Sequence, residues 1–178
     1  MYLDHTIAQY ESLGLPPTSG CTDAEVLSLE QHMDQTLPAA YREFLGWAGH
    51  DAGPIFSDLE DYTYDRIPDM QALAHELIDA YQFQTPLPED ALVFYVYDNV
   101  HFAFIRSGDG DDPTVYHFVE TPSTVTATFT STDPNQPVVE HHISTGSVTP
   151  QRFIPEGPFS VWIGRYIEEL AQEDGDGE

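Results

Sequence analysis

The chain's single cysteine and its eight histidines are the residues best suited to nucleophilic or acid–base chemistry. Cys21 directly precedes a helix start marked by Thr22, and the dipole of a helix N-terminus can lower the pKa of a thiol. A cysteine nucleophile also needs a base within hydrogen-bonding reach, and the sequence identifies no histidine for that role. The Gly-x-Ser-x-Gly elbow of hydrolases and the phosphate-binding glycine loops do not occur in the chain. We therefore expect an ordinary thiol and no catalytic residues.

The histidine spacing does not indicate a metal site. His141 and His142 are adjacent, so on a strand their side chains point to opposite faces. His101 and His117 lie on neighbouring predicted strands and could face each other, but no histidine pair has the i, i+4 spacing of a zinc protease. The acidic run at residues 109–112 lacks the flanking helices and distant glutamate of an EF-hand, so we interpret it as a turn. We expect no metal and no other cofactor.

Recognition of a protein partner is the other chemistry that the sequence suggests, and one segment has the composition for it. Residues 56–65 interleave acidic side chains with aromatic ones. Tyrosine supplies contact area at low entropic cost, and carboxylates attract a basic partner. The alternative interpretation is a solvated loop whose aromatic side chains turn into the core. The candidate partner-binding residues are Asp58, Glu60, Asp61, Tyr62, Tyr64 and Asp65.

The net charge limits the kinds of partner. Asp and Glu number 31 against five arginines and no lysine, which gives a formal charge of −26. Such a field repels nucleic acid and attracts a basic protein. An acidic, lysine-poor surface is also typical of proteins adapted to a saline cytoplasm, and the two interpretations are compatible. We expect a basic protein partner and no nucleic acid.

Length and composition predict a folded domain in the cytoplasm. A chain of 178 residues with 40% hydrophobic and 12% aromatic content is large and apolar enough to bury one core. No apolar run reaches the length needed to cross a bilayer, so we expect no membrane partner. Residues 1–5 lack the features of a signal peptide, and a lone cysteine cannot form an internal disulfide. The sequence does not indicate the oligomeric state.

A helical hairpin at residues 22–48 is the element around which we expect the rest to be organised. Residues 22–25, Thr-Asp-Ala-Glu, form a capping-box pattern at the start of its first helix. Pro38 suits the first turn of the second helix, and Gly46 and Gly49 suit its end. The apolar residues that recur at helical spacing in the second helix are Leu37, Tyr41, Phe44, Leu45 and Ala48.

This order of motifs resembles the SUKH superfamily, which includes fungal cell-wall-assembly regulators and many bacterial immunity proteins of polymorphic toxin systems. The resemblance lies first in the capped helix, the Leu-Pro pair at residues 37–38 and the Tyr-Arg-Glu-Phe-Leu string at residues 41–45. Residues 86–94 resemble the family's entry into its central sheet, and residues 159–170 resemble its closing helix. Arg42 in the string is either a recognition residue or an arginine whose head pairs with a nearby carboxylate.

The fold that we expect is α+β, with the N-terminal helical hairpin and a C-terminal helix packed around an antiparallel sheet. Residues 1–13 predict a short helix or arm, and further helices are predicted at residues 69–83 and 159–171. The predicted strands are at 92–97, 101–106 and 114–120. Short connections join the strands into an antiparallel meander.

One part of the chain fits the family pattern poorly. Residues 121–157 contain two extended runs and predict either an added hairpin or a long loop. The resemblance implies a single SUKH-like domain over residues 1–172, and we expect the acidic tail at residues 173–178 to be disordered.

The resemblance and the charge together predict a non-catalytic binding protein. The leading hypothesis is an immunity protein that neutralises a cognate bacterial toxin domain by binding it, and the charge favours a basic target such as a nuclease. A regulatory or scaffold protein of the same fold is one alternative. A hydrolase with an unrecognised site is another, and clustered histidine, cysteine and carboxylate side chains in a deep pocket would favour it.

Overall fold

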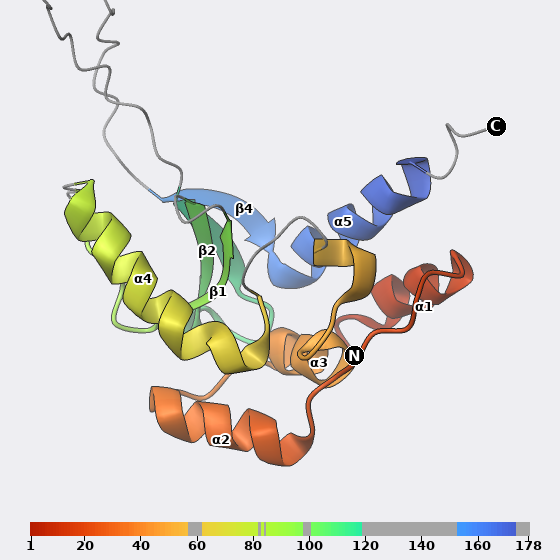
Figure 1. The fold of residues 1–178 in the computed structure, drawn as a ribbon, viewed down its shortest axis with the longest axis horizontal. Helices are drawn as coiled ribbons and strands as arrows, with labels where there is room; N and C mark the ends of the chain where they lie inside the picture. The colour runs from red at the N-terminus through yellow and green to blue at the C-terminus, as the bar shows by residue number, and fades with distance from the viewer. Residues whose placement is uncertain (57–61, 82, 84, 98–100, 119–152, 174–178) are drawn as a thin grey trace, which may run out of the picture.

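The fold is α+β, as predicted, with helices packed around one antiparallel sheet (Figure 1). The computed structural model describes residues 1–56, 62–81, 83, 85–97, 101–118 and 153–173. Within them the helices are α1 (Asp4–Ser12), α2 (Asp23–Met33), α3 (Ala39–Ala48), α4 (Ile67–Ala80) and α5 (Phe159–Glu173). The strands are β1 (Ala91–Tyr97), β2 (His101–Arg106), β3 (Thr114–Phe118) and β4 (Ile154–Pro158). Short 3-10 helices lie at Gly53–Phe56, Tyr64–Arg66 and Ser107–Asp109.

The sheet has the order β1-β2-β3-β4, and each neighbouring pair is antiparallel. The predicted three-strand meander is therefore present, and β4 extends it. α4 packs along β1, and the side-chain amide of Gln71 on α4 bonds to the carbonyl of Ala91 and the N–H of Val93. β1 is buried over almost its whole length, which explains why its sequence is a continuous apolar run and not an alternating one.

The aromatic side chains of α3 are buried in the core and contact both the sheet and α5. Tyr41 and Phe44 are 0% and 1% exposed. The ring of Tyr41 lies 5.3 Å from that of Phe159 on α5 and 5.7 Å from that of Phe94 on β1. α2 packs against α3, which confirms the predicted helical hairpin, and α3 continues through Gly46 to end at Ala48.

Several element boundaries differ from the prediction. α4 begins two residues earlier than predicted, at Ile67, because Pro68 is tolerated in a first turn, where its missing N–H costs nothing. The helix ends at Ala80. α5 continues to Glu173 and so includes the first residue of the predicted tail. No helix in the described part of the chain is both long and apolar enough to cross a membrane.

The strand β4 is missing from the prediction, which placed its residues in a hairpin or loop. Its sequence, Ile-Pro-Glu-Gly-Pro, contains two prolines that cannot donate to a ladder and a glycine with a φ of 105°. Such a strand is tolerated at the edge of a sheet, where β4 lies against β3. The predicted extra hairpin between residues 121 and 152 and the rest of the tail, at 174–178, lie outside the described residues.

The buried face of α3 yields a stability prediction. Replacing Phe44 by alanine should lower the free energy of unfolding by about 3–5 kcal/mol, because its ring is enclosed and the cavity would close only in part. Leu27→Ala on α2 is the control, since the Leu27 side chain is 51% exposed and should change stability little. Urea unfolding followed by circular dichroism measures both, and equal effects would contradict this assignment of the core.

Candidate functional site

Two short segments that are far apart in sequence pair to form the base of the site. The N–H of Ser19 donates to the carbonyl of Asp51 at 2.8 Å, and the N–H of His50 donates to the carbonyl of Ser19 at 2.9 Å. The N–H of Cys21 donates to the carbonyl of Leu45, near the end of α3, at 2.7 Å. These bonds hold the residues before α2 against the residues after α3.

Glycines allow this close approach. A Cβ atom on Gly20 would lie 1.8 Å from the carbonyl oxygen of Gly46, and one on Gly49 would lie 2.5 Å from the Sγ of Cys21. Both distances are far shorter than any non-bonded contact, so a larger residue at either position would push the two segments apart. The glycines therefore place the Cys21 thiol directly beside the start of the loop that follows α3.

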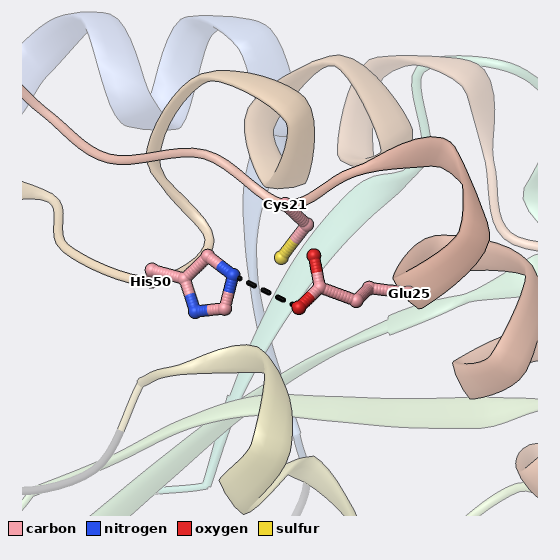
Figure 2. A group of neighbouring side chains, drawn as sticks. All are labelled: Cys21, Glu25 and His50. Carbon is pink, nitrogen blue, oxygen red and sulfur yellow. Dashed lines mark ion pairs between the residues drawn. The ribbon is translucent and has the colours of Figure 1, made fainter.

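Cys21, Glu25 and His50 meet at this point (Figure 2). The thiol sulfur, a carboxylate oxygen and an imidazole nitrogen all lie within 4.8 Å of one another. The Nε2 of His50 lies 3.2 Å from Oε1 of Glu25. Cys21 and Glu25 are half-buried, whereas His50 is exposed. The sequence alone does not indicate that these three residues lie together, and it identifies no base for Cys21.

The capping box holds the Glu25 carboxylate in place, as the sequence predicts. Its Oε2 accepts from the N–H of Thr22 at 2.7 Å and from the Thr22 hydroxyl at 2.9 Å. Its Oε1 accepts from the hydroxyl of Tyr64 at 3.2 Å. These hydrogen bonds, led by the one from the Thr22 backbone, lower the pKa of Glu25 to about 2, so the carboxylate is charged at neutral pH.

The Cys21 thiol has the opposite electrostatic character from an activated nucleophile. Burial, followed by the negative charges of Glu25 and Asp65, raises its pKa to about 11. The His50 Nε2 is directed at the Glu25 carboxylate, which competes with the thiol for it. This arrangement agrees with the prediction of an ordinary thiol. Burial and two carboxylates raise the pKa of Cys21 by more than the N-terminus of α2 can lower it.

A small hollow opens beside the three residues. It has a volume of about 150 Å³ and is lined by Glu25, Ser28, Leu29, His32, Tyr64, Asp65 and Pro68. Pockets that hold organic ligands usually measure about 300–1,000 Å³. A single side chain or an ion fits this hollow better than an organic substrate does.

The structure describes three of the six candidate partner-binding residues. Tyr64 and Asp65 line the hollow, and the Tyr64 ring packs edge-on against His50 with centroids 4.7 Å apart. The ring of Tyr62 lies 5.2 Å from that of Phe56, and its oxygen accepts from the N–H of Ala52. Both tyrosines are half-buried and Asp65 is exposed. Asp58, Glu60 and Asp61 lie outside the described residues.

The other candidate residues have structural contacts. His117 lies opposite Ala103, and His101 lies opposite Tyr97, so the two histidines do not form the facing pair that was considered. Arg42 lies 3.2 Å from Glu30 on α2, which favours the structural interpretation of that arginine.

The acidic run at residues 109–112 is a turn between β2 and β3, as interpreted from the sequence. The Asp112 carboxylate accepts from the N–H and the hydroxyl of Ser160 in the first turn of α5. The carbonyl of Asp111 accepts from the N–H of Ala40 at the start of α3. The run therefore holds the starts of two helices against the sheet.

Comparison with known proteins gives one family match. The model of the SMI1 / KNR4 family (SUKH-1) matches residues 20–133. The match begins one residue before Cys21 and includes Glu25, His50 and the candidate partner-binding segment. Curated proteins include no match to this chain.

The capping carboxylate predicts a pH-dependent stability. The folded-state pKa of Glu25, about 2, lies below its ordinary value of 4.5. The charged Glu25 carboxylate therefore contributes fully to the free energy of unfolding above its ordinary pKa. This contribution is lost as the pH falls through the folded-state pKa. Glu25→Gln should lower the melting temperature at neutral pH, and the difference from the wild type should vanish near pH 2.

Thermal unfolding by circular dichroism across this pH range measures the effect. Glu11→Gln, at an exposed position on α1, is the matched control and should leave the melting temperature nearly unchanged. A difference between Glu25→Gln and the wild type that stays constant down to the lowest pH would show that the charge does not contribute.

The raised pKa of Cys21 predicts slow alkylation of its thiol. Because the Cys21 pKa rises from 9.0 to about 11, iodoacetamide should alkylate the folded, metal-free protein roughly 10- to 100-fold more slowly than the urea-unfolded chain. Mass spectrometry of quenched samples follows the reaction, with Cys21→Ser as the blank. Faster alkylation in the folded state would identify an activated nucleophile and favour the hydrolase alternative.

Proposed function

This chain belongs to the SMI1 / KNR4 family (SUKH-1), and from that membership we propose that it is a non-catalytic binding protein that neutralises a cognate bacterial toxin domain. The family is consistent with immunity or regulatory roles. The net charge favours the immunity role, because a formal charge of −26 suits a basic target such as a nuclease domain.

The ion pairs of the structure support this reading of the charge. Each of the four arginines within the described residues lies against a carboxylate of the chain itself. The pairs are Arg42 with Glu30, Arg66 with Asp69, Arg106 with Asp90, and Arg165 with Glu156. These arginines therefore add little positive potential to the surface, and the excess of carboxylates meets an approaching partner almost unopposed.

Binding alone is sufficient for this function, because a toxin is neutralised when its active site is covered. The Cys21 thiol is protonated at neutral pH, and the hollow beside it is small. These features favour a protein that acts by occupying its target and not by modifying it.

The candidate face includes the segment that leads into α4. Asp65 is exposed, and together with Glu25 it makes the small hollow acidic. A lysine or arginine side chain of a partner would find two carboxylates and the Tyr64 ring there. The proposed partner-binding residues remain Asp58, Glu60, Asp61, Tyr62, Tyr64 and Asp65.

A regulatory role is the other function found in the family, and capture of partners distinguishes the two. The tagged full chain is incubated with an extract of the native host, and bound proteins are identified by mass spectrometry. A toxin domain encoded by a neighbouring gene supports immunity. Capture of endogenous regulatory proteins in its place supports the alternative.

The charge predicts a salt-dependent association with the captured toxin domain. Exposed charges are screened beyond about 8 Å at physiological ionic strength, so the association rate should fall steeply with added salt while the dissociation rate changes less. Neutralising Asp58, Glu60, Asp61 and Asp65 to their amides should lower the association rate roughly tenfold or more. Stopped-flow fluorescence at several salt concentrations measures both rates.

A variant with the same change in net charge tests the position of the face. It neutralises four exposed acids on other helices: Glu11, Glu76, Asp79 and Glu169. Equal slowing by the two variants would show that the overall field, and not this segment, guides association. An association rate independent of salt would mean that the acidity serves solubility or a saline cytoplasm.

A further inference from the structure

The donor atoms of Cys21, Glu25 and His50 form a set that a zinc ion prefers. A thiolate, an imidazole nitrogen and a carboxylate oxygen are the three ligand types of protein zinc sites. The three residues come from two segments that are joined by backbone hydrogen bonds, so the donor atoms lie close together without an ion.

We propose that Cys21, Glu25 and His50 bind one zinc ion, with water in the fourth position. This inference goes beyond the proposed function and does not depend on the identity of the partner. The ion would join the N-terminus of α2 to His50, the residue that follows Gly49 (Figure 2).

The distances fit a tetrahedral ion after small side-chain rotations. Zinc binds sulfur at about 2.3 Å and nitrogen or oxygen at about 2.0–2.2 Å, which places neighbouring donors about 3.4–3.6 Å apart. The Nε2 of His50 and Oε1 of Glu25 are already 3.2 Å apart, and no pair of donors is separated by more than 4.8 Å.

The surroundings support the carboxylate as a ligand. Metal-bound carboxylates are usually held by further hydrogen bonds, which orient the free oxygen. Here Thr22 occupies Oε2 through its N–H and its hydroxyl, and leaves Oε1 directed at His50. The Tyr64 hydroxyl on Oε1 and the Tyr64 ring against His50 fix the two ligands relative to each other.

The ligand types give the site its selectivity. A chain with a charge of −26 attracts any divalent cation, but calcium and magnesium require oxygen ligands. The cysteine sulfur and the imidazole favour zinc and similar transition metals over them. Coordination would deprotonate the thiol, and the exposed position of His50 would leave the ion open to water on that side.

Zinc would act here as a clip. It would tie residues 19–25 to residues 49–51, and through Tyr64 it would restrain the segment that leads into α4. The N–H of Tyr64 already donates to the carbonyl of Gly49 at 2.9 Å, so the segment is connected to the site by both backbone and side chain. The ion would add rigidity to the junction between these two segments.

Metal binding to the full chain tests the proposal. The protein is stripped with EDTA and titrated with Zn²⁺ by isothermal calorimetry and native mass spectrometry, and separately with Co²⁺ by absorption spectroscopy. The wild type should bind one ion and show the near-ultraviolet charge-transfer band of a thiolate–cobalt bond. Cys21→Ser should lose that band, and Cys21→Ser and His50→Gln should each weaken zinc binding by at least tenfold.

The control is His75→Gln on α4, an exposed histidine outside the cluster, which should keep wild-type affinity and the cobalt band. Circular dichroism of each variant verifies folding, and His50→Gln removes only an exposed side chain. Absence of the band in the wild type overturns the proposal. So does wild-type zinc affinity in Cys21→Ser, since the ion would then be held by acids or histidines elsewhere on the chain.

Discussion

Enclosure of the aromatic face of α3 is the constraint on which the rest of the structure depends. The ring of Tyr41 contacts both β1 and α5, and the ring of Phe44 contacts α5, so these contacts fix the position of the helix against both elements. The packing is demanding enough that the Tyr41 hydroxyl is buried without a hydrogen-bond partner among the described residues. An unpaired buried hydroxyl costs about 1–3 kcal/mol, which the surrounding ring contacts must offset.

The position of α3 then determines what happens at its two ends. At its start, the N–H of Ala40 reaches the turn between β2 and β3. At its end, the Leu45 carbonyl accepts from Cys21, and Gly49 and His50 emerge against the segment that begins α2. The proximity of Cys21, Glu25 and His50 is thus a consequence of core packing, because α3 brings the residues after it against the start of α2.

Much of this fold could be predicted from the sequence because its signals are local. Each of three signals can be recognised from a few neighbouring residues: the capping box at Thr22, the helical spacing of Tyr41 and Phe44, and the apolar run of β1. Cys21 and His50 carry no such signal, because their proximity depends on the pairing of Ser19 with Asp51 between two loops. β4 was missed for a similar reason, since its prolines contradict the usual strand composition and only its place beside β3 makes it a strand.

Within the described residues, each edge strand of the sheet has positions that hinder the addition of another strand. On β1 the side-chain amide of Gln71 occupies the carbonyl of Ala91 and the N–H of Val93, the groups that an incoming backbone would need. On β4 two of the five residues are prolines, and Gly157 distorts the strand between them. Many proteins recognise peptides by extending a sheet, and the same geometry initiates fibril growth. An added strand would lack backbone partners at these positions, which favours recognition through side chains over strand addition there.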